Sequence, residues 1–300
     1  MKTLEEINHY HVNKNHLAKE YLDALKDPTF KELTEILNLP DEILMKYTSM
    51  LQDSAIEYEH CKNCKNILAC KNKLTGFCYL PHVSNDGLIF GYQACKFQKK
   101  KQKESAYLNN IYLFDVPNEI KEAKMSDIYK DDKSRFKAIK WLTTFIKNYP
   151  DVSKGLYLYG NFGCGKTYLI AATFHELAKK GVKSAIVFWP EYLRDLKASF
   201  ATDFSEKFER LKKIPLLLID DIVAENTTVW SRDVIFCPLV QYRMQEGLPT
   251  FFTSNLTLEE LESHFSISKE SVDQVKARRI IERIRQLTEE LQMISKNLRK

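Results

Sequence analysis

Residues 160–167, GNFGCGKT, match the pattern G-x-x-x-x-G-K-[ST] of a phosphate-binding loop at every required position. The glycines allow backbone N–H groups to turn toward phosphates, and the N-terminal end of the helix predicted after the loop attracts the same anion. Lys166 is expected to neutralise the β- and γ-phosphates, and the Thr167 hydroxyl is expected to ligate Mg²⁺. Cys164 is interpreted as a small filler rather than a nucleophile. The predicted nucleotide-binding residues are Gly160, Asn161, Phe162, Gly163, Cys164, Gly165, Lys166 and Thr167.

Two acidic residues follow the apolar run LLLI at residues 216–219, which is predicted to be a buried strand. A Mg²⁺-dependent site needs an acid at the end of a neighbouring strand. Asp220 is therefore the predicted ligand of Mg²⁺ or of its water, and Asp221 is predicted to polarise the attacking water. The alternative is a pair of surface acids, which the phosphate loop makes less favourable.

A third predicted strand, TFFTSN, ends at Asn255, whose amide could orient water near the γ-phosphate. Thr253 and Ser254 carry a weaker signal. Asn255 could equally cap the helix predicted for LTLEELESHF, because asparagine is a common N-cap residue. Both interpretations of Asn255 remain open from the residues alone.

The segment KARRIIERIRQL is an arginine-rich amphipathic helix by its spacing. Arg279 and Arg283 lie four residues apart and so share one helical face, whereas Ile280, Ile281 and Ile284 form an apolar side. The helix could simply be solvated on its charged face. It could also offer an arginine to the nucleotide of a neighbouring subunit.

Five of the seven cysteines fall between residues 61 and 95, a density that in a cytosolic chain favours a metal over disulfides. Cys61 and Cys64 form a C-x-x-C knuckle, and Cys95 is the natural closing ligand at the end of the predicted strand GLIFGYQAC. Cys78 is preferred as the fourth ligand because a TGF turn precedes it, and the site would be structural Zn²⁺. The other candidates are Cys70, then His82, with His60 interpreted as a helix-end residue. A metal-free group of small buried cysteines is the alternative.

The periodicity predicts two different halves. Residues 1–58 contain apolar residues at helical spacing, and the cysteine-rich segment after them contains short alternating strands. We therefore predict a small, mainly helical zinc-binding domain over residues 1–100 and a basic, polar linker over 101–135. Strands alternate with helices over 136–300, which predicts an α/β domain with a parallel sheet between helices.

Composition limits the class of protein. No apolar run approaches the length of a membrane span, and the polar N-terminus is unlike a secretory signal, so a cytoplasmic protein that does not contact membranes is expected. Residues 1–60 hold six lysines and twelve acidic residues, whereas residues 61–105 hold nine lysines and two acidic residues. These opposite charges are typical either of separate surfaces for separate partners or of ordinary solvated faces.

The order of these motifs resembles the AAA+ ATPases: a phosphate loop, a strand ending in two acids, a strand ending in asparagine, and an arginine-bearing helix. LLLIDDIVAE, VIFCPLVQYRMQEGLPTFFTSNLTLEEL and ARRIIERIR resemble the bacterial helicase loaders of the DnaC and DnaI type. The cysteine-bearing N-terminal region points to the DnaI branch of that family. The resemblance covers nearly the whole chain and is most specific in the ATPase half.

The resemblance implies that residues 160–167 bind ATP, that Asp220 serves Mg²⁺ and that Asp221 is the hydrolytic acid. It assigns Asn255 to sensor one and Arg283 to the arginine finger, with Arg279 beside it, and Cys78 matches the third zinc-ligand position. It further implies an N-terminal domain that binds the replicative hexameric helicase and an ATPase domain that binds single-stranded DNA. Self-association on the helicase and contacts with other primosome proteins belong to the same expectation.

Several features depart from the wider AAA+ pattern. Asp221 stands where many members have glutamate, which leaves the rate of a weak ATPase open, and Val223 stands where close relatives often have glycine. About fifteen residues follow Arg285, so the helical lid is predicted to be reduced or absent. Arg299 is the candidate for sensor two.

Two rival functions remain at this stage. One is an IstB-like transposition-helper ATPase, against which the cysteine domain argues. The other is a non-hydrolysing adaptor in which ATP only locks a conformation. A metabolic kinase is disfavoured because no acceptor-binding segment is visible. For the loader, the basic run at residues 96–103, with Lys212 and Lys213, could assist in contacting DNA phosphates, and aromatic residues could stack on bases.

Overall fold

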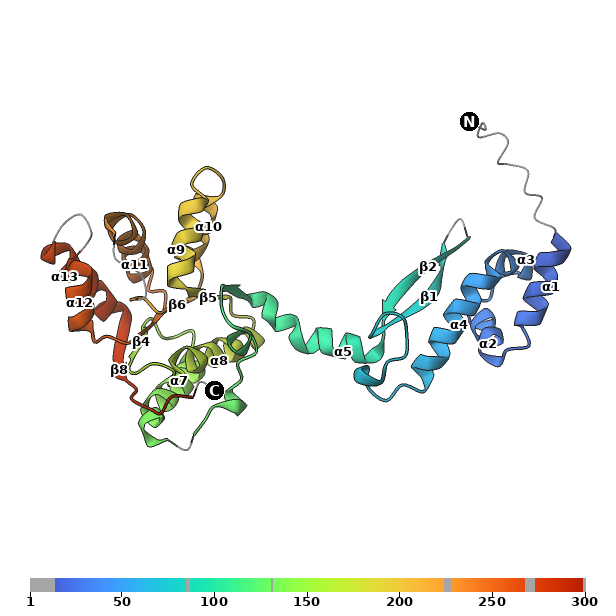
Figure 1. Ribbon diagram of the computed structural model, residues 1–300, viewed down its shortest axis with the longest axis horizontal. Coiled ribbons are helices and arrows are strands. Elements are labelled where there is room, and N and C mark those ends of the chain that lie inside the picture. The colour runs from blue at the N-terminus through green and yellow to red at the C-terminus, as the bar shows by residue number, and fades with distance from the viewer. Residues whose placement is uncertain (1–13, 85–86, 131, 224–227, 268–272, 299–300) are drawn as a thin grey trace. The chain divides into compact units, whose positions relative to one another are not determined.

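The computed structural model describes residues 14–84, 87–130, 132–223, 228–267 and 273–298. The chain divides into two units, Met1–Ala106 and Tyr107–Lys300 (Figure 1). No helix within the described ranges is long and apolar enough to cross a membrane.

Helices and one hairpin make up the first unit. The helices are α1 (Lys14–Ala24), α2 (Pro28–Leu37), α3 (Asp41–Leu44), α4 (Thr48–Lys62) and α5 (Lys96–Ser105). Strands β1 (Phe77–Ser84) and β2 (Gly87–Ala94) pair antiparallel. A small core holds the helices together, and its buried members include Tyr21, Phe30, Leu33, Leu44 and Leu51. The prediction of a mainly helical N-terminal region is confirmed.

The basic run predicted to begin a linker is in fact helix α5, which Cys95 caps by accepting a hydrogen bond from the Gln98 backbone N–H. None of the α5 residues is buried. The remainder of the predicted linker, residues 107–135, belongs to the second unit. Ile111, Ile120 and Ile128 are buried in its core, and apolar burial of this kind ties a segment to the domain.

A six-stranded sheet in the order β3-β5-β6-β7-β4-β8 forms the centre of the second unit, and every described pairing in it is parallel. The strands are β3 (Ile111–Phe114), β4 (Gly155–Tyr159), β5 (Ser184–Phe188), β6 (Leu216–Asp220), β7 (Thr250–Ser254) and β8 (Thr288–Gln292). The predicted parallel α/β fold is confirmed. Strand β8 was not expected, because its exposed Glu289 and Glu290 give it the polar character of an edge strand.

Helices cover both faces of this sheet (Figure 1). Alternate residues of one strand belong to opposite cores. Leu216 and Leu218 of β6 pack with α7 (Phe136–Asn148) and α8 (Lys166–Lys179). Leu217 and Ile219 pack with the helices of the other face. Those helices are α9 (Trp189–Ala198), α10 (Phe204–Lys213), α11 (Cys237–Gln245), α12 (Leu258–Ser266) and α13 (Gln274–Leu287). A short helix, α6 (Asn118–Lys121), packs on α8.

Proline marks two local features of this unit. Strand β5 ends at Phe188, because Trp189 and Pro190 open α9 and proline suits the first turn of a helix. A π-helix from Trp230 to Phe236 precedes α11, which has Pro238 in its first turn. Proline lacks the N–H that a continuous α-helix would use at this point.

Candidate functional site

The phosphate loop lies between the end of β4 and the start of α8. Its tight path depends on glycines with positive φ angles, +71° at Gly163 and +85° at Gly165. Phe162 at the tip of the loop is exposed, whereas the Cys164 side chain is fully buried in the core beneath it. The burial of Cys164 agrees with its interpretation as a filler.

Lys166 and Asn255 meet at the mouth of this loop. The Lys166 ammonium donates to the backbone oxygens of Gly160 (3.0 Å) and Asn161 (2.9 Å) and to Asn255 Oδ1 (2.9 Å). Asn255 does not cap α12, because Thr257 fills that position and forms a capping box with Glu260. The geometry therefore favours the interpretation of Asn255 as a site residue over that of a helix cap.

Asp220 stands at the carboxyl end of β6, where two threonine hydroxyls reach it. Thr167 Oγ1 and Thr253 Oγ1 both donate to Asp220 Oδ1, the latter at 2.6 Å. Burial raises the pKa of Asp220 because the charged carboxylate is desolvated, and the two hydroxyl hydrogen bonds oppose that rise. A buried carboxylate beside a threonine hydroxyl is a suitable donor set for Mg²⁺, which prefers oxygen ligands.

Thr253 is a site residue that sequence reasoning undervalued. Besides bonding Asp220, its hydroxyl accepts a hydrogen bond from the Asp221 backbone N–H at 3.0 Å. Asp221 itself has a φ of +52°, the left-handed region that is costly for most residues with a side chain. The signal for Thr253 was its position two residues before Asn255 at the end of β7, because alternate residues of a strand share a face.

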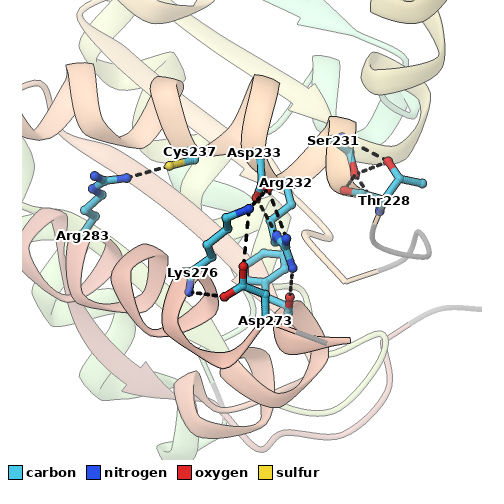
Figure 2. Close-up of polar contacts among 9 residues, drawn as sticks. Thr228, Ser231, Arg232, Asp233, Cys237, Asp273, Lys276 and Arg283 are labelled. Carbon is cyan, nitrogen blue, oxygen red and sulfur yellow. Dashed lines mark hydrogen bonds and ion pairs between the residues drawn. The ribbon is translucent and has the colours of Figure 1, made fainter. Parts of the chain in front are cut away.

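Arg279 and Arg283 lie on α13 and line a cavity of about 470 Å³ between α11 and α13, with Met244 and Val275 among its other residues. Arg283 Nη1 is 2.7 Å from Cys237 Sγ at the start of α11 (Figure 2). The phosphate loop contributes no residue to this cavity. Arg299, the candidate for sensor two, lies outside the described residues.

A charged network fixes α13 against the π-helix (Figure 2). The fully buried Arg232 donates to Asp233 (2.6 Å) and to the Phe265 backbone oxygen (2.9 Å). Lys276 of α13 bonds both Asp233 and Asp273. Neither Arg232 nor Asp233 was singled out from sequence, and the adjacent Arg-Asp pair carries no recognisable motif. The network holds the arginine-bearing helix in a defined orientation.

The cysteine cluster of the first unit lines a cavity of about 280 Å³. Three of the sulfurs accept hydrogen bonds from nitrogen donors: Asn72 Nδ2 donates to Cys61 (3.3 Å), the Gly76 N–H to Cys70 (3.4 Å) and the Gln98 N–H to Cys95 (3.5 Å). The Cys64 thiol donates to the Asn66 backbone oxygen (3.1 Å). The cysteines in the cavity wall are Cys61, Cys64, Cys70, Cys78 and Cys95.

Cys78 is the buried member of this group, and its pKa is raised first by burial and then by the charge and hydrogen bond of Cys61. His60 pairs with Asn72 (3.1 Å), and His82 lies against the Gln93 amide (3.2 Å). Within the part of the chain that the structure describes, no three His, Cys, Asp or Glu side chains are grouped closely enough to hold a metal ion. The cavity thus gathers the predicted ligands without forming a metal site.

No protein-family model matches the chain. Among curated proteins it is similar to the replicative helicase loader DnaI of Bacillus subtilis strain 168, with 33% identity over 276 residues, covering 90% of this chain and 87% of that protein.

Among solved structures, the chain is similar to a crystal structure of DnaI, with 45% identity and a TM-score of 0.57 over 64% of this chain and 99% of the other. A crystal structure of the DnaC helicase loader matches with 21% identity and a TM-score of 0.51, over 59% of this chain and 99% of that one. The DnaC match shows that the α/β fold is shared.

Proposed function

This chain belongs to the family of the replicative helicase loader DnaI, and from that premise we propose that it is an ATP-dependent loader of the replicative DNA helicase onto single-stranded DNA. One observation carries the proposal. The chain is related to a helicase loader over 90% of its length, and its second unit brings Lys166, Thr167, Asp220 and Asn255 together at one edge of a parallel sheet. Ligands of open α/β sheets bind at such carboxyl edges.

In the proposed ATP site, the backbone N–H groups of the phosphate loop and the Lys166 ammonium bind the phosphates. Lys166 already bonds three oxygens, so on nucleotide binding it exchanges backbone oxygens for phosphate oxygens. Thr167 and Asp220 would hold Mg²⁺, which neutralises charge on the phosphates. Asp221 orients the attacking water, and Asn255 contacts the γ-phosphate.

Arg283, with Arg279 beside it, would act on the nucleotide of a neighbouring copy. The support is that both arginines line a cavity to which the chain's own phosphate loop contributes nothing. Cys237 bonds Arg283, and the network around Arg232 holds α13 in place (Figure 2). The Arg283 side chain therefore loses little conformational entropy when copies of the chain associate. This role requires that copies of the chain associate, as expected on the ring-shaped helicase.

The first unit is proposed to bind the helicase and to hold structural Zn²⁺ through Cys61, Cys64, Cys78 and Cys95. All four line one cavity, and thiolates are preferred zinc ligands. The side chains must close by rotation around the metal, because they are not grouped as a site now. Cys70, whose sulfur accepts the Gly76 N–H, is left as the fifth cysteine.

Single-stranded DNA is proposed to bind the second unit, where aromatic rings are accessible. Phe200 is 54% exposed and stacks on Phe204 at 4.9 Å. Exposed rings of this kind stack on bases without sequence preference. Lys212 and Lys213 are weaker candidates than the sequence suggested, because both form ion pairs with Glu209. The five lysines of α5 belong to the first unit, where they lie on a helix with no buried residue, and they are a separate candidate for phosphate contacts.

The function is tested by helicase loading onto circular single-stranded DNA, with the full chain, ATP and the replicative helicase of the same host. The chain is expected to increase loading, and Lys166→Ala is expected to abolish the ATP-dependent part. Lys137→Ala is the matched control, because Lys137 is an exposed lysine on α7. Loading that is independent of the chain would reject the proposal. Absence of measurable ATP turnover, even with DNA and helicase present, would favour the non-hydrolysing adaptor.

A further inference from the structure

The backbone N–H groups and the backbone carbonyl groups of the phosphate loop require different hydrogen-bonding partners. In a loop of this kind the N–H groups face the phosphates, and the carbonyl groups require other partners, since buried backbone groups are rarely left unpaired. The Gly160 and Asn161 oxygens accept from Lys166, whereas the Gly163 and Cys164 oxygens have partners outside the loop. In this protein residues 293–298, which we call the C-terminal tail, lie against the loop. The tail is separated from the loop by more than a hundred residues of sequence.

Strand β8 brings the tail to the loop. It pairs in parallel with β4 from Gly155 opposite Thr288 to Tyr159 opposite Gln292. The next N–H, that of Met293, donates to the Tyr159 oxygen at 2.7 Å. The tail therefore starts beside the end of β4, where the phosphate loop also starts.

Hydrogen bonds then join the tail to the loop itself. The Asn161 side chain forms a reciprocal pair with the Ser295 backbone, donating to its oxygen (2.5 Å) and accepting from its N–H (3.1 Å). The Leu298 N–H donates to the Gly163 oxygen at 2.8 Å. The amide of Asn161 is thus engaged by the tail, although the sequence pattern had assigned this residue to the nucleotide.

A second segment, preceding α7, completes the arrangement. Ser295 Oγ donates to Asp132 Oδ2 at 2.6 Å, and the buried Arg135 donates through Nη1 to the Cys164 oxygen at 2.7 Å. Asp132 and Arg135 thereby tie the tail and the loop to the same turn. The oxygens of Gly163 and Cys164 are both satisfied, one by the tail and one by Arg135.

The tail also lies very close to two glycines of the loop, Gly160 and Gly163. A Cβ at Gly160 would stand 1.9 Å from the Met293 oxygen, and a Cβ at Gly163 would stand 2.0 Å from Asn297 Oδ1. Real Cβ atoms essentially never approach another heavy atom this closely. The Met293 oxygen belongs to the backbone, so the tail requires glycine at position 160, whereas the Asn297 amide is the end of a side chain that can move away from position 163. The loop and tail are therefore fitted to each other along several residues.

We propose that the C-terminal tail is a brace that positions the phosphate loop for ATP, with Asn161, Ser295 and Asp132 as its positioning residues. The brace holds the Gly163 carbonyl outward, which keeps the N–H groups directed at the phosphates before ATP arrives. Preorganisation of this kind strengthens binding by removing an ordering cost. The inference rests on the proposed ATP site and assigns a role to side chains that bond the tail or the turn before α7 rather than the nucleotide.

The brace should affect ATP binding more than the chemical step. Thr167, Asp220, Thr253 and Asn255 are held by β6, β7 and each other, so they keep their geometry when the tail is loosened. Loss of the brace therefore raises Kd and KM for ATP and leaves kcat nearly unchanged. Substitution of a residue that only stabilised the fold would lower the melting temperature without raising KM selectively over kcat.

The test uses the full chain and measures Kd with a fluorescent ATP analogue, KM and kcat for ATP, and the melting temperature. Asn161→Ala removes two hydrogen bonds and is expected to weaken ATP binding about tenfold, and Ser295→Ala and Asp132→Ala about three- to fivefold each. The Ser295→Ala/Asp132→Ala double variant should be no weaker than Asp132→Ala alone, because Asp132→Ala already removes the bond to Ser295, together with the Asp132 bonds to Ser134. Asp132→Asn keeps an acceptor and should restore most of the affinity.

Ile294→Ala is the matched control, since Ile294 belongs to the same tail but its side chain is 59% exposed. It should bind ATP as the unaltered chain does. Unchanged Kd in Asn161→Ala and Ser295→Ala, or an equal loss in Ile294→Ala, overturns the brace while leaving the ATP site intact. An unaltered chain that binds no ATP overturns the proposed function itself, and the brace with it.

Discussion

The phosphate-loop site and the cysteine cavity differ in whether their side chains are already in contact without a bound ligand or metal. At the phosphate loop, Lys166 already contacts Asn255, and Thr167 already contacts Asp220, at hydrogen-bonding distance. In the cysteine cavity, the predicted ligands share a wall but are not grouped as a metal set. The first geometry is imposed by backbone and sheet pairing. The second depends on side-chain rotation, which the metal itself would drive, because structural Zn²⁺ contributes folding energy directly.

The largest expected effect is therefore metal removal, which should act on the first unit alone. Cys61→Ser combined with Cys64→Ser is expected to abolish zinc binding and unfold this unit, because structural zinc sites contribute roughly 10–16 kcal/mol of apparent binding free energy. ATP binding by the second unit should persist. Zinc content by atomic absorption, limited proteolysis and ATP affinity measure the three outcomes.

Cys70→Ser is the control for this experiment, since Cys70 is the cysteine left out of the proposed ligand set. It should retain one zinc per chain. If Cys70→Ser loses zinc and Cys78→Ser keeps it, the ligand assignment is wrong. If the native chain carries no zinc, the cluster is a metal-free group of cysteines.

The reverse experiment disrupts the second unit without touching the cysteines. Arg243 is fully buried, and its guanidinium donates to Thr250 Oγ1 and to the backbone oxygens of Leu211, Ile214 and Pro249. Arg243→Ala is expected to cost about 3–5 kcal/mol of unfolding free energy, because it leaves these buried oxygens without a donor.

The effect of Arg243→Ala is measured by unfolding the chain with denaturant and using the loss of ATP binding as the signal for unfolding of the second unit. The control is Arg210→Ala, which removes an exposed arginine lying over the Tyr112 ring at 4.2 Å. A comparable loss in both variants would show that burial of the guanidinium is not the cause. Zinc content should be unchanged in each.

A smaller and more local effect is expected from Asp220→Asn, which keeps the shape of the side chain and removes its charge. Mg²⁺-dependent turnover should fall by roughly two orders of magnitude, since the metal would lose an anionic ligand. Binding of ATP without Mg²⁺ should be retained or improved, and the fold should be unaffected. Steady-state turnover with a titration of Mg²⁺ tests this, and normal Mg²⁺ dependence would remove Asp220 from the site.

The smallest effect concerns pH and belongs to the second unit. Burial lowers the pKa of His175 below its usual value of 6.5, and its Nε2 bonds the Ile120 oxygen. Below pH 6.5 the unfolded chain binds a proton that the folded chain resists, so the stability of this unit should fall as the pH is lowered through that value. Thermal unfolding of the native chain and of His175→Gln, each at pH 7.5 and 5.5, should show a smaller pH dependence in the variant.

Much of the second unit could be predicted from the sequence because its signals are local. Apolar runs marked three strands: glycines bound β4, two acidic residues follow β6, and Pro249 and Asn255 bound β7. The loop pattern marked Lys166 and Thr167. For Asn255 the sequence left a site residue and a helix cap open, and the structure placed its side chain beside Lys166, where the carboxyl ends of parallel strands meet. The edge strands β3 and β8 were missed, since their few and partly exposed apolar residues resemble linker sequence.

The sequence by itself determined the chemistry at the phosphate loop, the α/β class and the gathering of cysteines in the first unit, because each depends on residue types at short spacing. Only the tertiary structure decided that Asn161 bonds the C-terminal tail, that Thr253 joins Asp220 and that Arg283 contacts Cys237. These contacts join residues 33 to 134 positions apart. Sheet order and helix packing bring such residues together, and no periodicity along one segment records that pairing.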